Sequence, residues 1–328
     1  MNLTEGAVLG LVQGLTEFLP VSSSAHLRVV AALAGWEDPG AAFTAVTQIG
    51  TAAAVIVYLR SDLARMGRAW LRSVGGPGRE AAGGNVRSSR ARRAAARSGA
   101  RPGPAGPDEA AGPDEAAEAR MAWLIAAGTV PIGACGYLFE DVIKGRLRDL
   151  RLTAGTLAGV GLLLGAADRW AADRWAADRW TGSRAAPRRP LAELSTRDGL
   201  LIGLAQATAL IPGVSRSGAT IGGGLMLRYS REAAARYSFL LAVPAVIVSG
   251  AFGLDRLYRE ARQPASTVAW GPLGAASVTA FLVGYAAIAW FLRYVSAHGF
   301  APFVVYRVGL GLLLLALVLA GRMPAVPA

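Results

Sequence analysis

The sequence is poor in the residues that cover a water-facing surface. Only 17% of its 328 residues are charged, whereas 53% are hydrophobic, and the mean hydropathy is +0.38. Such a chain cannot cover soluble domains with polar side chains, so we expect a protein that crosses a membrane several times. The same composition excludes a collagen, a coiled coil, a disulfide scaffold and a wholly disordered chain.

Cysteine and acidic residues are also scarce. The single cysteine, Cys135, lies in an apolar run, so the chain forms no internal disulfide. Lys and Arg number 34 against 22 Asp and Glu, a net charge of +12. In a soluble protein this excess would suggest nucleic acid, but here the basic residues stand between apolar runs, where they orient spans and meet lipid headgroups. We therefore expect membrane lipids as partners and no nucleic acid.

Six apolar runs predict transmembrane helices. They cover residues 41–59, 121–139, 152–167, 237–254, 272–292 and 301–321. Most of these runs approach the ~20 residues that a helix needs to cross hydrocarbon. Arg307, in the last run, is expected to snorkel towards an interface rather than to bind substrate.

Two further apolar stretches carry ionisable residues beside a Pro/Ser break. Residues 5–35 contain Glu17 and His26, and residues 199–227 contain Arg216. One straight span would place these groups in lipid at a cost of roughly 2.5 kcal/mol or more each. Two short helices joined by a turn avoid this cost, because irregular backbone is tolerated at membrane depth where protein or water surrounds it. Each stretch is therefore predicted to be a re-entrant helical hairpin.

The basic loops predict the orientation of the chain. Residues 61–101 and 168–198 contain more arginines than acids, so both should be cytoplasmic. The first hairpin then enters from outside and the second from inside, and three spans follow each. The predicted fold is all-α integral membrane, with six transmembrane helices plus two re-entrant helical hairpins arranged as an inverted-topology repeat. The repeats cover residues 1–167 and 199–328, and their functional site lies where the two breaks meet.

Two segments between the spans have biased composition. Residues 75–120 are rich in Gly, Ala, Arg and Pro and are predicted to be a disordered cytoplasmic loop. Residues 168–198 are predicted to be a cytoplasmic linker between the repeats, and Ala-Ala-Asp-Arg-Trp occurs three times from Ala166. A five-residue copy is too short to be a solenoid unit, so these copies imply no chemistry.

The first break carries groups suited to phosphate chemistry. Gln13 and Glu17 are four residues apart, so they share a helix face. Glu17 is a hard oxygen ligand, and one carboxylate plus substrate phosphates is the usual arrangement for Mg²⁺. His26 can exchange protons near neutral pH, and hydroxyls beside such a base are candidate nucleophiles. The hydroxyls here belong to Ser22, Ser23 and Ser24.

The second break supplies an arginine for anion binding. Arg216, flanked by Ser215 and Ser217, can bind a phosphate bidentately. Thr220 follows at the start of a Gly-rich helix, whose free N–H groups add a second anion-binding element. The two breaks together fit phosphoryl transfer, in which positioning and charge neutralisation do most of the catalysis.

Structural explanations stand beside these functional ones. Ser22 can serve packing or interhelical hydrogen bonding, and Glu17 and Arg216 can form a buried structural ion pair. Gln48, in the middle of a span, is either a helix-packing hydrogen bond or a partner of the substrate site. The residues alone do not separate these alternatives.

Two long motifs resemble the signature motifs of the undecaprenyl-diphosphate phosphatases, an integral-membrane family associated with bacitracin resistance. They are Gln13-Gly-Leu-Thr-Glu-Phe-Leu-Pro-Val-Ser-Ser-Ser-Ala-His26 and Pro212-Gly-Val-Ser-Arg-Ser-Gly-Ala-Thr220. The similarity continues through Phe239-Leu-Leu-Ala-Val-Pro244 and Pro302-Phe-Val-Val-Tyr-Arg307. The resemblance implies hydrolysis of undecaprenyl diphosphate to the monophosphate carrier lipid, with a divalent cation, at a site that opens toward the periplasmic or outer face of a bacterial inner membrane.

The resemblance also implies roles for individual residues. Glu17 is similar to the family's metal-linked glutamate and Arg216 to its diphosphate-binding arginine. Gln13 stands where many members have a second glutamate, which puts a two-carboxylate metal site in doubt. We expect Mg²⁺ or Ca²⁺ at Glu17, with Gln13 as a second ligand to be tested, and Ser23, His26 or a water as nucleophile. The expected catalytic residues are Glu17, Ser22, Ser23, His26 and Arg216, and the expected substrate-binding residues are Gln13, Ser24, Ser215, Ser217, Thr220 and Gln48.

A rival hypothesis comes from the architecture itself. Inverted repeats with broken helices are typical of transporters, so a polyprenyl-phosphate flippase or secondary transporter is the alternative function. Release of phosphate by the purified protein separates the two, because a pure transporter releases none. The expected partners are a polyprenyl diphosphate substrate and membrane lipids, with a homodimer as one option for the oligomeric state.

Overall fold

The computed structural model describes residues 1–38, 40–75, 113–145, 147, 149–180, 189–263, 268–323 and 325. This described part of the chain is helical and has no named strand. It divides into two compact units, which are Ser61–Trp123 and the remainder, Met1–Arg60 with Leu124–Ala328. All the groups predicted to carry chemistry belong to the larger unit.

Several of the described helices are long and apolar. Five of them could cross a membrane by length and composition, namely α6 (Pro113–Leu138), α8 (Leu150–Trp180), α11 (Arg231–Ala261), α12 (Trp270–Ala297) and α13 (Ala301–Leu319). A sixth candidate is α3 (Gly40–Tyr58) together with α4 (Arg60–Gly75), counted as one broken span. A multi-pass membrane protein is therefore confirmed. Short helices α7 (Glu140–Lys144) and η2 (Leu191–Glu193) lie between the longer elements.

The described ends of the long loop are helical, which corrects the boundaries expected from sequence. Disorder was predicted up to residue 120, but α6 begins at Pro113, where proline is well suited to the first helical position. Within the smaller unit, Arg65 and Arg72 of α4 pair with Glu118 and Glu115 of α6, each at 2.8 Å. The polar first turns of α6 thus form ion pairs with α4, which the composition of the segment does not reveal. Residues 76–112 of the predicted loop lie outside the described part.

The tripled pentapeptide continues α8 instead of forming a linker from residue 168. Alanine, arginine and tryptophan tolerate a helix, so α8 runs on to Trp180. Within the first copy, Asp168 is buried and accepts hydrogen bonds from Arg231 Nε at 2.6 Å and from the Phe300 backbone N–H at 3.0 Å. Asp168 thus fastens α8 to the start of α11 and to the turn before α13.

Both helix–break–helix stretches expected from sequence are present. The first consists of α1 (Leu3–Thr16) and α2 (Ser23–Ala34). The second consists of α9 (Thr196–Ala207), the one-turn η3 (Thr208–Leu210) and α10 (Arg216–Met226). In each, a proline interrupts the helical hydrogen bonding, and a serine with a positive φ precedes the next helix.

Residues with the same role in the two stretches are separated by the same number of positions along the chain. Asn2 caps α1 with its side chain on the Glu5 N–H, and Ser195 caps α9 with its side chain on the Asp198 N–H. Each first helix then uses a glycine for a close approach. A Cβ at Gly10 would lie 2.2 Å from the carbonyl oxygen of Ala276 on α12, and a Cβ at Gly203 would lie 2.4 Å from Cα of Gly128 on α6.

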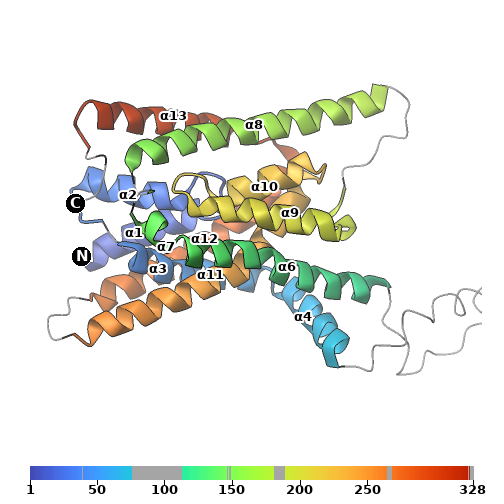
Figure 1. Cartoon of the computed structure of the whole chain (residues 1–328), viewed down its shortest axis with the longest axis horizontal. Coiled ribbons are helices and arrows are strands. Elements are labelled where there is room, and N and C mark those ends of the chain that lie inside the picture. The colour runs from blue at the N-terminus through green and yellow to red at the C-terminus, as the bar shows by residue number, and fades with distance from the viewer. Residues whose placement is uncertain are drawn as a thin grey trace, which may run out of the picture. The chain divides into compact units, whose positions relative to one another are not determined.

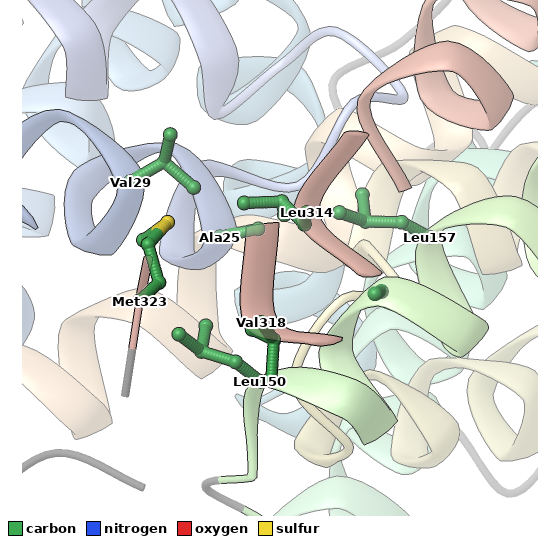
Figure 2. Packing of buried hydrophobic residues seen from close by; sticks show 8 residues of the cluster. Ala25, Val29, Leu150, Leu157, Leu314, Val318 and Met323 are labelled. Carbon is green, nitrogen blue, oxygen red and sulfur yellow. The ribbon is translucent and has the colours of Figure 1, made fainter. Parts of the chain in front are cut away.

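Two apolar clusters hold the first helix pair in place. One joins α2 to α8 and α13 through Ala25, Val29, Leu150, Ala154, Leu157, Leu314, Val318 and Met323 (Figure 2). The other joins α1 and α2 to α3, α11 and α12 through Leu9, Leu27, Phe43, Val46, Leu257, Leu273 and Ala276. α8 and α13 run beside each other (Figure 1). The break between α1 and α2 is thereby fixed from two sides.

Candidate active site

The two breaks have the same local backbone. Ser22 has φ 72° and Ser215 has φ 69°, so both serines adopt the left-handed region that non-glycine residues rarely occupy. The Ser22 hydroxyl is 3.3 Å from that of Ser24, and the Ser215 hydroxyl is 3.1 Å from that of Ser217. Strain of this kind costs of order 1–3 kcal/mol per residue and clusters at functional sites. We call residues 17–24 tip 1 and residues 212–218 tip 2.

Glu17 connects the two tips. Its carboxylate is buried and accepts hydrogen bonds from Gln13 Nε2 at 2.9 Å and from the Ser23 hydroxyl at 2.6 Å, both on Oε2. Its Oε1 accepts from Arg216 NH2 at 3.0 Å, although Arg216 lies 199 positions away in the chain. The structure thus brings together four of the residues singled out in the sequence.

Two polar atoms at this junction are buried without a hydrogen-bond partner in the described structure. They are Gln13 Oε1, an acceptor, and Arg216 NH1, a donor. Buried polar groups are nearly always hydrogen-bonded, so such a pair calls for an explanation. An acceptor beside a carboxylate suits a cation, and a free guanidinium N–H suits a phosphate oxygen.

Ser215 and Ser217 of tip 2, and Thr220 just after it, hold the tip in position. Ser217 donates its hydroxyl to the carbonyl oxygen of Leu19 in tip 1 at 2.9 Å. Ser215 Oγ accepts the Gly218 N–H at 3.1 Å, which caps α10. Thr220 donates to the Arg216 carbonyl at 2.8 Å, and its hydroxyl lies 2.6 Å from that of Ser238 on α11.

His26 has two hydrogen-bond partners, and neither is Ser23. A carbonyl oxygen only accepts, so the 2.7 Å contact with the Ser22 carbonyl requires the proton on Nδ1. Nε2 then accepts from the Tyr306 hydroxyl at 2.7 Å, and the two rings stack with centroids 5.5 Å apart. Both ring nitrogens are therefore engaged by groups other than Ser23, one of the three candidate nucleophiles.

Gln48 and Ser24 stand apart from the Glu17 junction. Gln48 is half-buried on α3, and its backbone carbonyl accepts a hydrogen bond from the Thr51 hydroxyl. Ser24 is exposed and contacts Ser22. Among the described residues, no cluster of three or more His, Cys, Asp or Glu side chains is placed to hold a metal ion. A cation here would have Glu17 as its one carboxylate ligand.

Sequence reasoning missed three residues at the site. Ser238 and Tyr306 make the contacts just described, and Arg307 was expected to snorkel. That expectation is wrong, because Arg307 is fully buried and its guanidinium donates to backbone carbonyls of both tips. The pair Tyr306-Arg307 ends a run already noted for its resemblance to a family, which was the available signal.

Comparison with known proteins places the chain in a family. The family model for the bacitracin resistance protein BacA matches residues 6–313. A protein of Frankia casuarinae named undecaprenyl-diphosphatase 2 is 55% identical over 323 residues, which cover 98% of this chain and 97% of the relative. An undecaprenyl-diphosphatase 2 of Streptomyces avermitilis is 49% identical over 98% of this chain and 97% of the relative. An undecaprenyl-diphosphatase of Thermobifida fusca is 45% identical over 98% of this chain and 92% of the relative. The chain belongs to the BacA family of bacitracin resistance proteins.

Proposed function

We propose that this chain is a membrane phosphatase that hydrolyses undecaprenyl diphosphate to undecaprenyl phosphate and inorganic phosphate, which recycles the carrier lipid for cell-wall synthesis. The names of its relatives support this substrate, and its long apolar helices supply the membrane setting that a prenyl lipid requires. The flippase alternative gains no support from those names.

The observation that carries the proposal is the meeting of Glu17 and Arg216. They come from motifs 199 positions apart, yet they are in contact at 3.0 Å with a buried, unpartnered guanidinium nitrogen beside them. A terminal phosphate could take the free NH1 first and then replace Glu17 on NH2. Arginine binds phosphate in this forked manner, and such charge-assisted bonds are about twice as strong as neutral ones.

Ser23 is the group best placed to attack. Its hydroxyl already donates to Glu17 Oε2, so Glu17 can take the proton as the Ser23 oxygen bonds to the terminal phosphorus. The bond from that phosphorus to the bridging oxygen breaks, and undecaprenyl phosphate leaves. Water then cleaves the phosphoserine and releases phosphate. His26 takes no part in proton transfer in this scheme, because its contacts support a role in holding the Ser22 carbonyl.

The oxygens of Glu17 and Gln13 fit a divalent cation, Mg²⁺ or Ca²⁺. The unpartnered Gln13 Oε1 would add a neutral ligand to the single carboxylate, and hard cations accept amide oxygens of this kind. The cation would neutralise charge on the diphosphate. Gln13 Nε2 meanwhile keeps Glu17 oriented through its own hydrogen bond at 2.9 Å.

The membrane arrangement that we propose is the inverted repeat of six spans and two re-entrant hairpins. The constant offset between the hairpins supports it. The first helix of each hairpin also packs on a span of the other repeat, α1 on α12 and α9 on α6. The arginine-rich loops lie on the cytoplasmic side in this scheme, and the site opens to the outer face of the bacterial inner membrane. The lipid tail leaves sideways between the spans.

Phosphate release by the purified protein tests the proposal. Detergent-solubilised protein is given C55 diphosphate with and without EDTA, and we expect release that EDTA abolishes. Arg216→Ala should release almost none, whereas Arg293→Ala, an exposed arginine on α12, serves as the matched control and should equal the parent. Equal release by Arg216→Ala, or none by the parent, would refute the proposed function.

A further inference from the structure

Arg307 is the most deeply buried charged side chain among the described residues of the larger unit. It lies six residues after the start of α13, has 0% of its surface exposed, and forms no ion pair among the described residues. All four hydrogen bonds of its guanidinium go to backbone carbonyls. NH1 donates to Pro20 at 2.9 Å, NH2 to Gly213 at 2.9 Å and Val214 at 3.0 Å, and Nε to Leu157 at 3.1 Å.

The carbonyls that Arg307 binds occupy equivalent places in the two tips. Pro20 and Gly213 each precede by two residues the serine with a positive φ. Carbonyls at a helix break lack the partners that a continuous helix provides, and in a membrane each unsatisfied group costs several kcal/mol. One side chain therefore supplies donors to the same orphaned position in both hairpins.

The room for this guanidinium is built into the neighbouring backbone. A Cβ at Gly218 of tip 2 would lie 2.8 Å from Arg307 NH1, so alanine there would displace the guanidinium or the tip. A Cβ at Gly161 of α8 would lie 3.1 Å from the Arg307 Cβ. The side chain thus fits closely between α8 and both tips.

The links between the tips differ in what substrate binding does to them. Glu17 and Arg216 form one link, but a phosphate that binds Arg216 must loosen it. Arg307 makes only backbone contacts, which the substrate leaves intact. The strained serines also need surroundings that hold them, since such conformations persist only where neighbouring contacts fix them.

We propose that Arg307 is a positioning residue that sets the spacing of tip 1 and tip 2, and so the placement of Ser23 and Glu17 against Arg216 when substrate is bound. This inference rests on the proposed function for its kinetic consequence but not for its structural one. The planar guanidinium of Arg307 has five donors and reaches carbonyls of both tips. A lysine ammonium is a single point with three donors, so it cannot replace these contacts.

The test uses Arg307→Lys and Arg307→Gln, with Arg293→Gln as control for loss of an arginine. Each full-length variant is studied in detergent below its own unfolding midpoint. We expect Arg307→Lys to lower kcat by about 100-fold, since a displacement near 1 Å can cost that much, with KM changed only a few-fold. A role confined to stability would lower the unfolding midpoint and leave kcat of the folded protein unchanged, which would overturn the proposal.

Spin labels measure the spacing without any assay of activity. Cysteines replace Ser24 in tip 1 and Ile211 immediately before tip 2, in a Cys135→Ala background. One narrow distance distribution is expected with Arg307 present, and a broader or longer one with Arg307→Lys or Arg307→Gln. An unchanged distribution in both variants would contradict the inference. The distance distribution could change in the Arg307 variants while the parent protein, without cysteine substitutions, releases no phosphate. That result would support the spacing role of Arg307 and refute the proposed function.

Discussion

The hydroxyl of Ser23 and the carboxylate of Glu17 are joined by a hydrogen bond of 2.6 Å. The two oxygens of Glu17 have separate partners, because Oε2 binds Ser23 and Gln13 while Oε1 binds Arg216. A nucleophile and a phosphate-binding group therefore share one carboxylate. Movement of Arg216 onto a phosphate would free one oxygen without disturbing the hydrogen bond to Ser23.

Ser23→Ala removes the hydroxyl from this pair. We expect the rate of phosphate release to fall by about a thousandfold, the scale seen when an activated nucleophile or a key polar group is lost. After one rapidly quenched turnover with terminally labelled diphosphate, the parent should carry label on Ser23. Ser296→Ala, at an exposed serine on α12, is the control. Activity near that of the parent in Ser23→Ala would show that water attacks directly.

His26→Asn distinguishes two roles of His26, holding the Ser22 carbonyl and acting as a general base. The asparagine amide nitrogen stands near the place of Nδ1, so it can still donate to the Ser22 carbonyl, but it cannot accept a proton near neutral pH. If His26 holds the tip, we expect His26→Asn to keep at least about a tenth of the activity and His26→Ala to lose more. A loss beyond about 100-fold in both variants, with an altered pH profile, would instead assign the general base to His26.

Much of the site could be predicted from sequence because its chemistry is local. Glu17 and Arg216 are conspicuous, since each lies within four residues of a proline in an otherwise apolar stretch where a charge is costly. The similarity of the two breaks predicted that they form related structures. The contact of 3.0 Å between these residues agrees with that reasoning.

The remaining features depend on contacts that no local pattern reveals. Arg307 looked like a snorkelling residue because its partners are backbone carbonyls, which exist as acceptors only after both tips have broken their helices. Tyr306 reaches His26 across 280 positions, so neither residue indicates the other. α8 extends through the repeated pentapeptide because its residues tolerate a helix, a property that the repeat length does not indicate.

Glu17 and Arg216 either take part in catalysis or form an ion pair that only stabilises the fold, and mutants distinguish these roles. Glu17→Gln and Arg216→Ala should each lower activity by two to three orders of magnitude, roughly the loss for one electrostatic group, while the unfolding midpoint changes little. Arg216→Lys should recover little, because it lacks the planar fork. A purely structural pair would behave differently. Each single mutant would be strongly destabilised, and Glu17→Gln with Arg216→Met would restore folding and activity.

Asp198, at the start of α9, should make stability depend on acid pH. Burial alone would raise its pKa, but hydrogen bonds from Tyr229, Ser195 and Arg189 hold the pKa of Asp198 below its ordinary value. Burial and the bond to Asp198 raise the pKa of Tyr229 to about 12, so Tyr229 remains a donor.

Because the folded pKa of Asp198 is below the unfolded one, the carboxylate stabilises the fold above about pH 4, and this contribution is lost as pH falls through the folded pKa. The difference in unfolding midpoint between the parent and Asp198→Asn should therefore shrink between about pH 5 and pH 3. Asp255→Asn, at an exposed carboxylate, is the control. A difference that stays constant over this range would contradict the assignment.

The inverted repeat requires the two hairpins to enter from opposite faces, and cysteine labelling can measure this. Glu37 is exposed in the connection after α2, and Thr196 is exposed at the first residue of α9. In a Cys135→Ala background, a membrane-impermeant thiol reagent should label Glu37→Cys in intact cells. Thr196→Cys should react only after the membrane is opened, because its loop neighbours the arginine-rich segment that stays inside. If both cysteines reacted from the same side, the hairpins would share one face, and the meeting of Glu17 with Arg216 would need another topology to explain it.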